Sequence, residues 1–434
     1  MPSATAPQTP VPAPDSSRAK KLQLLGILSG FAAGAWLGAA EAPTKLVSIG
    51  ISPMVISLIM VFGVFLARWS LPALILGTSS VRADVHRAPH LIIWALLAGC
   101  LWAVANTLTI FAIRDIGLSI AFPLWNSNSL LGIFWGVLFF NELRQAGWRR
   151  WTGVLGGALL MCGGATLLAV ASSTQGPTAH SFRGVWAALG AGILWGTMYI
   201  PYRKAYLTGM NPLSFVTFFT FGELGMMSAL AVSYLGAAPL WHELVSARDV
   251  LFWLMLGGFI WVIGDVFQQY AAKYVGISRG IPLSNSNQLW GLLWGIFVFG
   301  ELHGRGASIY LQVIGGSALM MLGVAAIAFS SATRQEQSRW KESAQREVLR
   351  YGTSSEYVEA RLNGRQAAGE LKPSRSALDW FLVAVATCTF IIFARLARVP
   401  QIPVHWAPVL LLTAALLLLL LVSGLALWRT TRFN

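Results

Sequence analysis

Long apolar runs separated by short polar stretches make up most of this chain. A helix needs about 20 apolar residues to cross a bilayer, and ten runs before residue 331 approach or exceed that length. The first five predicted segments cover residues 22–44, 52–78, 91–113, 117–141 and 151–172, and the second five cover 184–207, 212–236, 250–273, 277–300 and 308–330. Two more runs, 377–397 and 405–428, follow. The pattern predicts an all-α polytopic membrane protein.

The two sets of five segments are copies of each other. Residues 117–143, GLSIAFPLWNSNSLLGIFWGVLFFNEL, match residues 276–302, GISRGIPLSNSNQLWGLLWGIFVFGEL, at 14 of 27 positions with an offset of 159. Both copies carry an Asn-Ser-Asn triplet three residues after a proline. Because five is an odd number, the second copy enters the membrane from the opposite side. The sequence therefore predicts an inverted 5+5 repeat, the architecture of many secondary transporters.

Polar segments divide the chain further. Residues 1–21 are predicted to be a disordered cytoplasmic tail, residues 22–173 the first repeat and residues 183–331 the second. Residues 332–375 carry nine Lys or Arg and six Asp or Glu. They are predicted to be a cytoplasmic linker, either solvated or lying on anionic lipid headgroups. Residues 376–429 are predicted to add a transmembrane hairpin to the ten-helix unit.

Composition and charge refine this picture. Only 11% of the residues are charged and 56% are hydrophobic, against about 25% charged in soluble proteins. The formal charge of +14 indicates membrane orientation and not nucleic-acid binding, because the basic residues are assigned to short loops. With a cytoplasmic N-terminus, the predicted inner side holds 13 Lys or Arg and the outer side five. The inner residues include Arg68, Arg203, Lys204, Lys273 and Arg279. We expect a multi-pass protein of the inner, or plasma, membrane.

Catalytic signatures are absent from the sequence. There is no HExxH, Walker A or GxSxG motif and no acidic metal cluster, and the three cysteines have no paired spacing. We therefore expect neither an enzyme nor a cofactor or metal site. The polar groups inside the apolar segments are mostly amides, which are suited to recognition.

Two matching pairs of residues suggest a binding site. Trp102 and Asn106 are four residues apart, as are Trp261 and Asp265, so each pair shares one helix face. An indole that stacks on a sugar ring, beside amides and a carboxylate that bond its hydroxyls, suits a sugar or similar polyol. The alternative is that these side chains hold helices together. The predicted binding residues are Trp102, Asn106, Asn126, Asn128, Trp261, Asp265, Gln268, Gln269, Asn285 and Asn287.

Charged residues inside the segments suggest ion coupling. Asp265 stands where the first copy has the neutral Asn106, and desolvation favours the protonated form of a buried carboxylate. Asp265 is therefore the predicted proton-coupling residue, with Glu223 as the second candidate. Glu41 and Lys45 are predicted to form a gate. Glu142, near a segment end, is interpreted as an anchor that reaches the headgroups or an adjacent basic loop.

The segment LWAVANTLTIFAIRDIGLSIAFPL, the FWGVLFFNEL that follows, and their second copies resemble the drug/metabolite transporter superfamily. They are most similar to its ten-helix sugar-uptake branch, the glucose/ribose porters and rhamnose/proton symporters. The resemblance implies ten helices, an inverted repeat, a central cavity and cation-coupled import. It also implies pathway-lining roles for Trp102, Asn106, Gly117, Pro123, Asp265, Gly276 and Pro282. The linker and the last two helices depart from the ten-helix pattern.

The leading hypothesis is a secondary active transporter that imports a sugar or similar small polar solute with protons by alternating access. A drug or metabolite exporter is the alternative within transport, and a sensor or scaffold acting through the linker and hairpin is the alternative from another class. An anionic solute is disfavoured, because only Lys273 and Arg279 are expected near mid-membrane depth. The expected partners are the solute and the lipid bilayer, without nucleic acid, and a homo-oligomer is left open.

Overall fold

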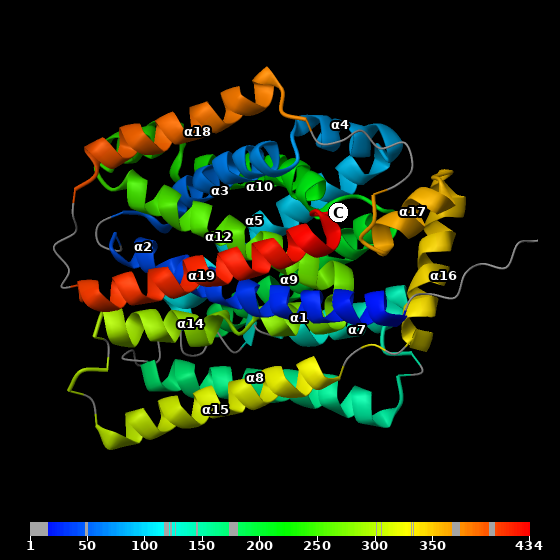
Figure 1. Cartoon of the computed structure of the whole chain (residues 1–434). Helices are drawn as coiled ribbons and strands as arrows, with labels where there is room; N and C mark the ends of the chain where they lie inside the picture. The colour runs from blue at the N-terminus through cyan, green and yellow to red at the C-terminus, as the bar shows by residue number, and fades with distance from the viewer. Residues whose placement is uncertain are drawn as a thin grey trace, which may run out of the picture.

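The computed structural model describes residues 16–47, 51–116, 121, 124–125, 127–144, 146–172, 181–300, 302–304, 306–330, 332, 334–366, 374–398 and 404–434. All regular secondary structure in these residues is helical, and the long helices lie side by side as a bundle (Figure 1). Nine of the described helices are long and apolar enough to cross a membrane. The predicted all-α membrane fold is confirmed.

The predicted segments correspond to helices in chain order. The first repeat contains α1 (Ser16–Ala39), α3 (Pro53–Ile75), α5 (His90–Ile116), α7 (Asn128–Phe140) and α8 (Trp148–Ser172). The second contains α9 (Ser181–Leu207), α10 (Pro212–Leu235), α12 (Leu251–Val275), the run α13 (Ile277–Ser284), α14 (Asn287–Leu293) and η1 (Trp294–Val298), and α15 (Ala307–Phe329). Short helices α2 (Glu41–Lys45), α4 (Thr78–Arg87) and α11 (Ala237–Ser246) lie between them. The remaining helices are α16 (Arg334–Tyr351), α17 (Ser355–Leu362), α18 (Ala377–Leu396) and α19 (Trp406–Thr431).

The predicted continuous segment 277–300 is broken. Helix α13 ends just after Pro282, which has no N–H to donate, and α14 begins at Asn287. In the first copy, helix α7 begins at Asn128, which matches Asn287 of the second copy. The last asparagine of each triplet therefore starts a helix, and at the break in the second copy Ser284 and Ser286 are buried.

Glycines bring helices of the two repeats into close contact in matching pairs. The backbone of Met255 leaves no room for a Cβ at Gly63, and the backbone of Leu96 leaves none at Gly222. At the offset of 159 between the repeats, Gly63 matches Gly222 and Leu96 matches Met255. The same contact is therefore made twice, with the two repeats exchanged.

The last helices of the two repeats run antiparallel. Along the contact between α8 and α15, Gly157 lies against Gly323 and Gly164 lies against Gly316. The residue numbers rise along one helix as they fall along the other. Gly157 matches Gly316 and Gly164 matches Gly323 at the offset of 159. Exchanging the two repeats therefore gives the same two glycine contacts.

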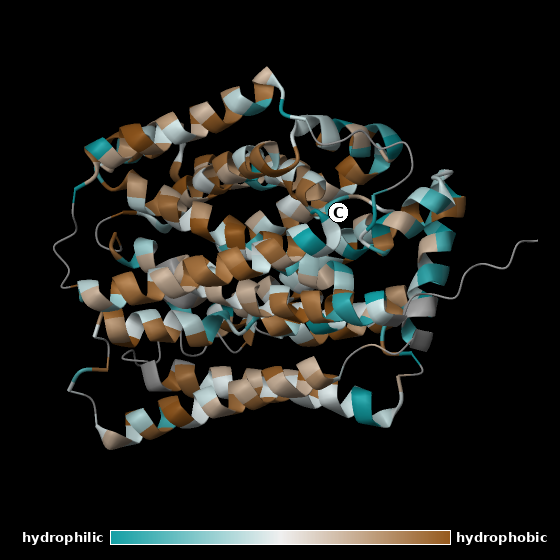
Figure 2. Ribbon diagram, in the orientation of Figure 1, coloured by the Kyte–Doolittle hydropathy of each residue, from teal (hydrophilic) through white to brown (hydrophobic). Residues whose placement is uncertain are grey.

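The linker, residues 332–375, is packed against the bundle over α16 and α17 and is not a solvated connector there. Helices α16 and α17 pack against one end of the bundle, which we call the linker end (Figure 1). Trp340, Ala344 and Val358 of these helices are buried. Hydrophilic residues gather at this end, whereas hydrophobic residues dominate the long helices (Figure 2). The linker is thus part of the folded unit.

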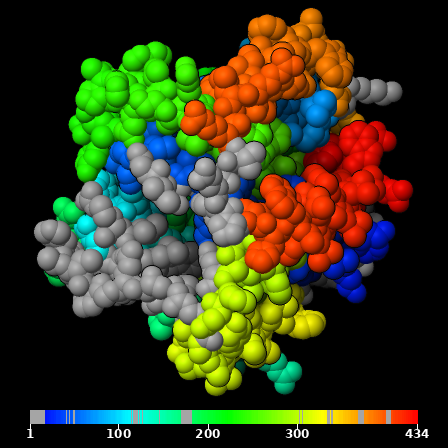
Figure 3. All heavy atoms as spheres, turned by 90° about the vertical axis from the view of Figure 1, so that its left-hand side faces the viewer, coloured from blue at the N-terminus to red at the C-terminus, as the bar shows by residue number. Residues whose placement is uncertain are grey.

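The last two long helices lie against different parts of the bundle. Helix α18 packs along α3, and α19 packs along α1 (Figure 1). They also occupy separate positions on the bundle when it is viewed from the end opposite the linker (Figure 3). Each helix therefore packs mainly on the ten-helix unit, to which the sequence predicted that a transmembrane hairpin is added.

Candidate functional site

Three charged side chains meet inside the bundle, one from each of three helices. The guanidinium of Arg68 on α3 donates from Nη1 to Oε2 of Glu223 on α10, at 2.8 Å. Its Nη2 donates to Oδ2 of Asp265 on α12, also at 2.8 Å. All three residues are 0% exposed. We call this group the central triad.

The placement of Arg68 in an inner loop is wrong, because this residue lies inside α3 and is fully buried. Besides Lys273 and Arg279, Arg68 is therefore a further basic residue, and it lies within a helix that is long and apolar enough to cross a membrane. A signal was present: a single arginine inside an apolar run is costly in a membrane and needs a partner there. Glu223 and Asp265 were the carboxylates available to it.

Aromatic rings surround the central triad. The Arg68 guanidinium carbon lies 4.2 Å from the ring centroid of Phe219 and 5.3 Å from that of Trp261, so both rings are in cation–π range. Trp261 in turn makes an edge-to-face contact with Trp102, with centroids 5.3 Å apart. The two matching tryptophans therefore meet where the repeats join, beside the triad.

The polar network continues from the triad along α12 to α9. Gln269 donates from Nε2 to Oδ1 of Asp265 at 2.7 Å, and Tyr206 donates its hydroxyl proton to Gln269. Gln268, the adjacent residue, donates to the Ser284 hydroxyl at 2.6 Å. Asp265 and Gln269, expected to line an open cavity, are thus buried and bonded to other side chains.

Several buried polar atoms near the triad have no hydrogen-bond partner among the described residues. They are Arg68 Nε, Glu223 Oε1, Tyr202 Oη and Thr220 Oγ1. Thr220 and Glu223 are three residues apart on one face of α10, and the Tyr202 ring packs edge-to-face on Phe219. An unpaired buried polar group costs about 1–3 kcal/mol. Two of these atoms belong to the triad itself, so the triad keeps hydrogen-bonding capacity that no described residue satisfies.

Asparagines of the triplets join the two repeats at the helix breaks. Asn285 donates from Nδ2 to Asn128 Oδ1 at 3.0 Å and to the Ser129 hydroxyl at 2.6 Å. The matching contact would join Asn126 to Asn287, and Asn126 lies outside the described residues. Asn287 starts α14, where its backbone lies against Gly34 and Gly38 of α1.

The other predicted site residues lie around this centre. Asn106 donates to the Ser57 hydroxyl at 3.3 Å, so the matching positions Asn106 and Asp265 both bond a side chain of α3. Lys45 lies 5.6 Å from the ring centroid of Phe299 in the other repeat. The Glu41 side chain, its predicted partner in a gate, lies outside the described residues, as do Gly117 and Pro123.

A second charged group lies at the linker end. Arg203 forms an ion pair with Glu142 at 2.9 Å, and Arg279 donates to both carboxylate oxygens of Glu336, at 2.7 and 3.0 Å. All four residues are buried. We call them the linker-end cluster. Arg203 and Arg279 were expected in loops, and their burial corrects those placements. Glu142 was expected to reach the headgroups or a basic loop, and it pairs with the buried Arg203.

Backbone contacts explain why the linker-end cluster has this geometry. Glu142 accepts hydrogen bonds from the backbone N–H groups of Ile277 and Ser278, at 3.1 and 2.9 Å. Gly276, just before them, has a φ of 84°, and a Cβ there would collide with the Glu142 carboxylate. Glycine is therefore required at this position. Glu336, from the linker, also accepts from the Leu143 N–H at 2.9 Å, so it bridges the two repeats.

The chain is similar in sequence to known sugar-uptake proteins. Residues 186–357 match the model of a family described as sugar transport protein. A predicted sugar uptake protein of Listeria innocua is 25% identical over 234 residues, which is 53% of this chain and 76% of the relative. The glucose uptake protein of Staphylococcus xylosus is 25% identical over 213 residues, 49% of this chain and 69% of the relative. A solved crystal structure of another protein covers 72% of this chain and 96% of its own, with 16% identity and a TM-score of 0.43. The predicted resemblance to sugar-uptake membrane transporters is confirmed.

Proposed function

We propose, from the premise that this chain is a relative of sugar-uptake membrane transporters, that it is a secondary carrier for a sugar and that the central triad couples transport to protons. The observation that carries the proposal is the charge of the triad. Two carboxylates flank one guanidinium with no exposure to solvent. A buried group with one uncompensated negative charge is strongly disfavoured. The triad therefore calls for one additional positive charge, and a proton is the simplest.

Hydrogen bonding favours Glu223 as the group that carries this proton in the proposal. Both carboxylate oxygens of Asp265 accept hydrogen bonds, from Arg68 and from Gln269, and this favours its ionised form. Glu223 uses only Oε2, and its Oε1 has no partner among the described residues. The proposed order of the two candidates is therefore the reverse of the order expected from the sequence. Asp265 holds Arg68, and Glu223 binds and releases the proton.

The same region suits a polyhydroxylated solute. The unpartnered groups of Tyr202, Thr220 and Glu223 are those that pair with sugar hydroxyls. Trp261 and Trp102, directly beside the triad, provide flat apolar surfaces for the C–H face of a sugar ring. This arrangement, together with the names of the similar proteins, supports a sugar as the solute.

Alternating access follows in this proposal from the duplicated architecture. The paired glycine contacts, which recur when the repeats are exchanged, and the antiparallel contact of α8 with α15 support an inverted repeat. Rocking one repeat against the other would open the triad to either face in turn. We propose import through the inner, or plasma, membrane, with the N-terminus and the linker end in the cytoplasm.

Transport by purified protein in liposomes tests the proposal. D-Glucose and a panel of other monosaccharides are measured in two modes, accumulation driven by an imposed pH gradient and counterflow without a gradient. Glu223→Gln, a neutral isostere, is expected to lose gradient-driven accumulation and to retain counterflow. Asp265→Asn is expected to lose both, because it removes a charged acceptor from Arg68. Glu342→Gln, at an exposed position of the linker, is the matched control.

The outcomes separate the alternatives. Binding without counterflow for every sugar would favour a sensor or scaffold over a carrier. Gradient-driven accumulation by Glu223→Gln at the rate of the unchanged protein would refute proton coupling at Glu223. A sodium gradient imposed in place of the pH gradient tests the other common coupling ion.

A further inference from the structure

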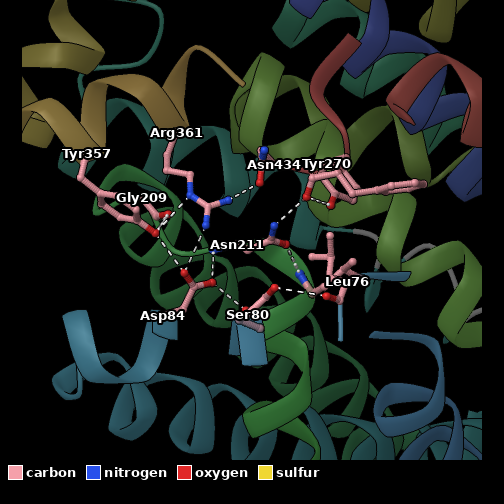
Figure 4. A network of polar contacts seen from close by, with 12 residues as sticks. Leu76, Ser80, Asp84, Gly209, Asn211, Tyr270, Tyr357, Arg361 and Asn434 are labelled. Atoms are coloured by element: carbon pink, nitrogen blue, oxygen red, sulfur yellow. Dashed lines mark hydrogen bonds and ion pairs between the residues drawn. The ribbon is translucent and has the colours of Figure 1, made fainter. Parts of the chain in front are cut away.

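A second polar network ties the linker and the last residues of the chain to the bundle (Figure 4). Asp84 on α4 is its centre. Its carboxylate accepts from the Tyr357 hydroxyl at 2.9 Å and pairs with Arg361 at 3.4 Å, both on α17. It also accepts from the Ser214 hydroxyl at 2.6 Å and from the Asn211 N–H at 3.2 Å, where α10 begins.

The last two residues of the chain extend this network to α12. The Phe433 carbonyl accepts from Tyr270 Oη at 2.8 Å and from Asn211 Nδ2 at 2.6 Å. Tyr274 donates to the carbonyl of Asn434, whose side chain accepts from Arg361. Linker, last residues and three elements of the bundle thus share one set of hydrogen bonds, with Arg361 at the junction.

The helices that this network joins are those that carry the central triad. Helix α3, with Arg68, leads directly into α4 and Asp84. Helix α10, with Glu223, begins beside Asn211, and Tyr270 lies five residues after Asp265 on α12. The triad and the network are therefore two layers of contacts that join α3, α10 and α12 at different depths.

We infer that α17 and residues 433–434 act as an intramolecular latch that keeps the linker end of the carrier closed. This inference rests on the proposed function, because alternating access requires that end to open. Separation of α3 from α10 and α12 must break both layers. The latch therefore sets how often the linker end opens, and the triad makes opening depend on the bound proton.

Removal of single latch hydroxyls is expected to shift this equilibrium without dismantling the fold. Tyr270→Phe deletes one hydrogen bond, to the Phe433 carbonyl. Tyr357→Phe deletes the bond to Asp84 and also the bond that the Tyr357 hydroxyl accepts from Arg361. Both variants retain the ring. A net hydrogen bond corresponds to about a two- to tenfold change in an equilibrium constant. Tyr310→Phe is the matched control, because it deletes a bond of similar length, 2.9 Å to the Leu302 carbonyl, on α15.

Thiol labelling measures opening without any solute. In a background with Cys100, Cys162 and Cys388 changed to alanine, Thr217→Cys introduces a buried reporter on α10. Its native hydroxyl bonds the Arg68 carbonyl, so it lies between the two layers. Ala158→Cys, a buried reporter on α8, monitors general loosening. A membrane-impermeant maleimide is applied to the purified full-length protein.

The expected result is about a two- to tenfold faster labelling of Thr217→Cys in Tyr270→Phe, a larger increase in Tyr357→Phe and the largest in the double variant. Labelling of Ala158→Cys, and of both reporters with Tyr310→Phe, is expected to stay unchanged. Unchanged labelling of Thr217→Cys, or equal acceleration at Ala158→Cys, would overturn the latch. Failure of the proposed function would appear separately, as the absence of sugar counterflow by the unaltered protein.

Discussion

The molecule contains two buried clusters of charged side chains, and they differ in net charge. The linker-end cluster contains two arginines and two carboxylates, Arg203 with Glu142 and Arg279 with Glu336. The central triad contains one arginine and two carboxylates. Both are removed from solvent. Only the first is neutral by itself.

This difference separates a fixed contact from a variable one. A cluster with equal numbers of positive and negative charges needs no further ion to neutralise it, so it can persist through every step of a transport cycle. An unbalanced group changes its stability whenever a cation arrives or leaves. Both groups are buried and ion-paired, so only the excess of one negative charge sets the triad apart as the proposed coupling site.

The largest effect is expected from breaking the balanced cluster. Glu336→Ala removes the bidentate acceptor of Arg279 and the acceptor of the Leu143 N–H, and it leaves a buried arginine without its counter-ion. Loss of one partner of a buried ion pair costs about 3–5 kcal/mol. Unfolding of the purified protein in mixed micelles by added SDS measures this cost.

A matched variant on the same helix makes this measurement specific. Glu342, also on α16, pairs with Arg339 with its side chain 56% exposed. Glu342→Ala is expected to change the unfolding free energy by less than about 1 kcal/mol. Equal costs for the two variants would show that Glu336 is not the counter-ion of a buried arginine.

An intermediate and asymmetric effect is expected in the central triad. Asp265→Asn removes a charge that Arg68 and Gln269 both bond, so we expect a loss of about 1–3 kcal/mol. Glu223→Gln leaves one positive and one negative charge, a balanced pair. It is expected to cost less than about 1 kcal/mol or to stabilise the protein. Parallel SDS unfolding of the two variants at pH 7 checks the order. A larger loss for Glu223→Gln would reverse the assignment of the proton.

Trp102, Trp261 and Arg68 show which parts of the site the sequence can predict and which it cannot. The apolar runs and the duplication, both written in local composition, predicted the helices and the matching of Trp102 with Trp261. Arg68 was missed because an arginine in a run that ends in a basic loop looks like a loop residue. Its burial depends on carboxylates that lie 155 and 197 residues away in the chain. No local pattern contains that pairing.

The linker shows the opposite error. Nine basic and six acidic residues in 332–375 predicted a solvated segment. Composition does not reveal that Glu336 and Arg361 each meet an oppositely charged residue buried at the linker end. Sequence patterning identifies which faces are apolar, but the partners of charged residues are set by tertiary contacts.

The smallest effect is expected where a charged pair remains in water. Lys341 and Glu359 join α16 to α17 at 2.6 Å, with side chains 38% and 49% exposed. Solvent screens such pairs, and they contribute about 0–1 kcal/mol. Lys341→Gln is therefore expected to leave SDS unfolding and sugar counterflow nearly unchanged, although it breaks an ion pair shorter than any in the triad. A loss as large as that of Asp265→Asn would mean that distance, and not burial and charge balance, decides which pairs matter in this protein.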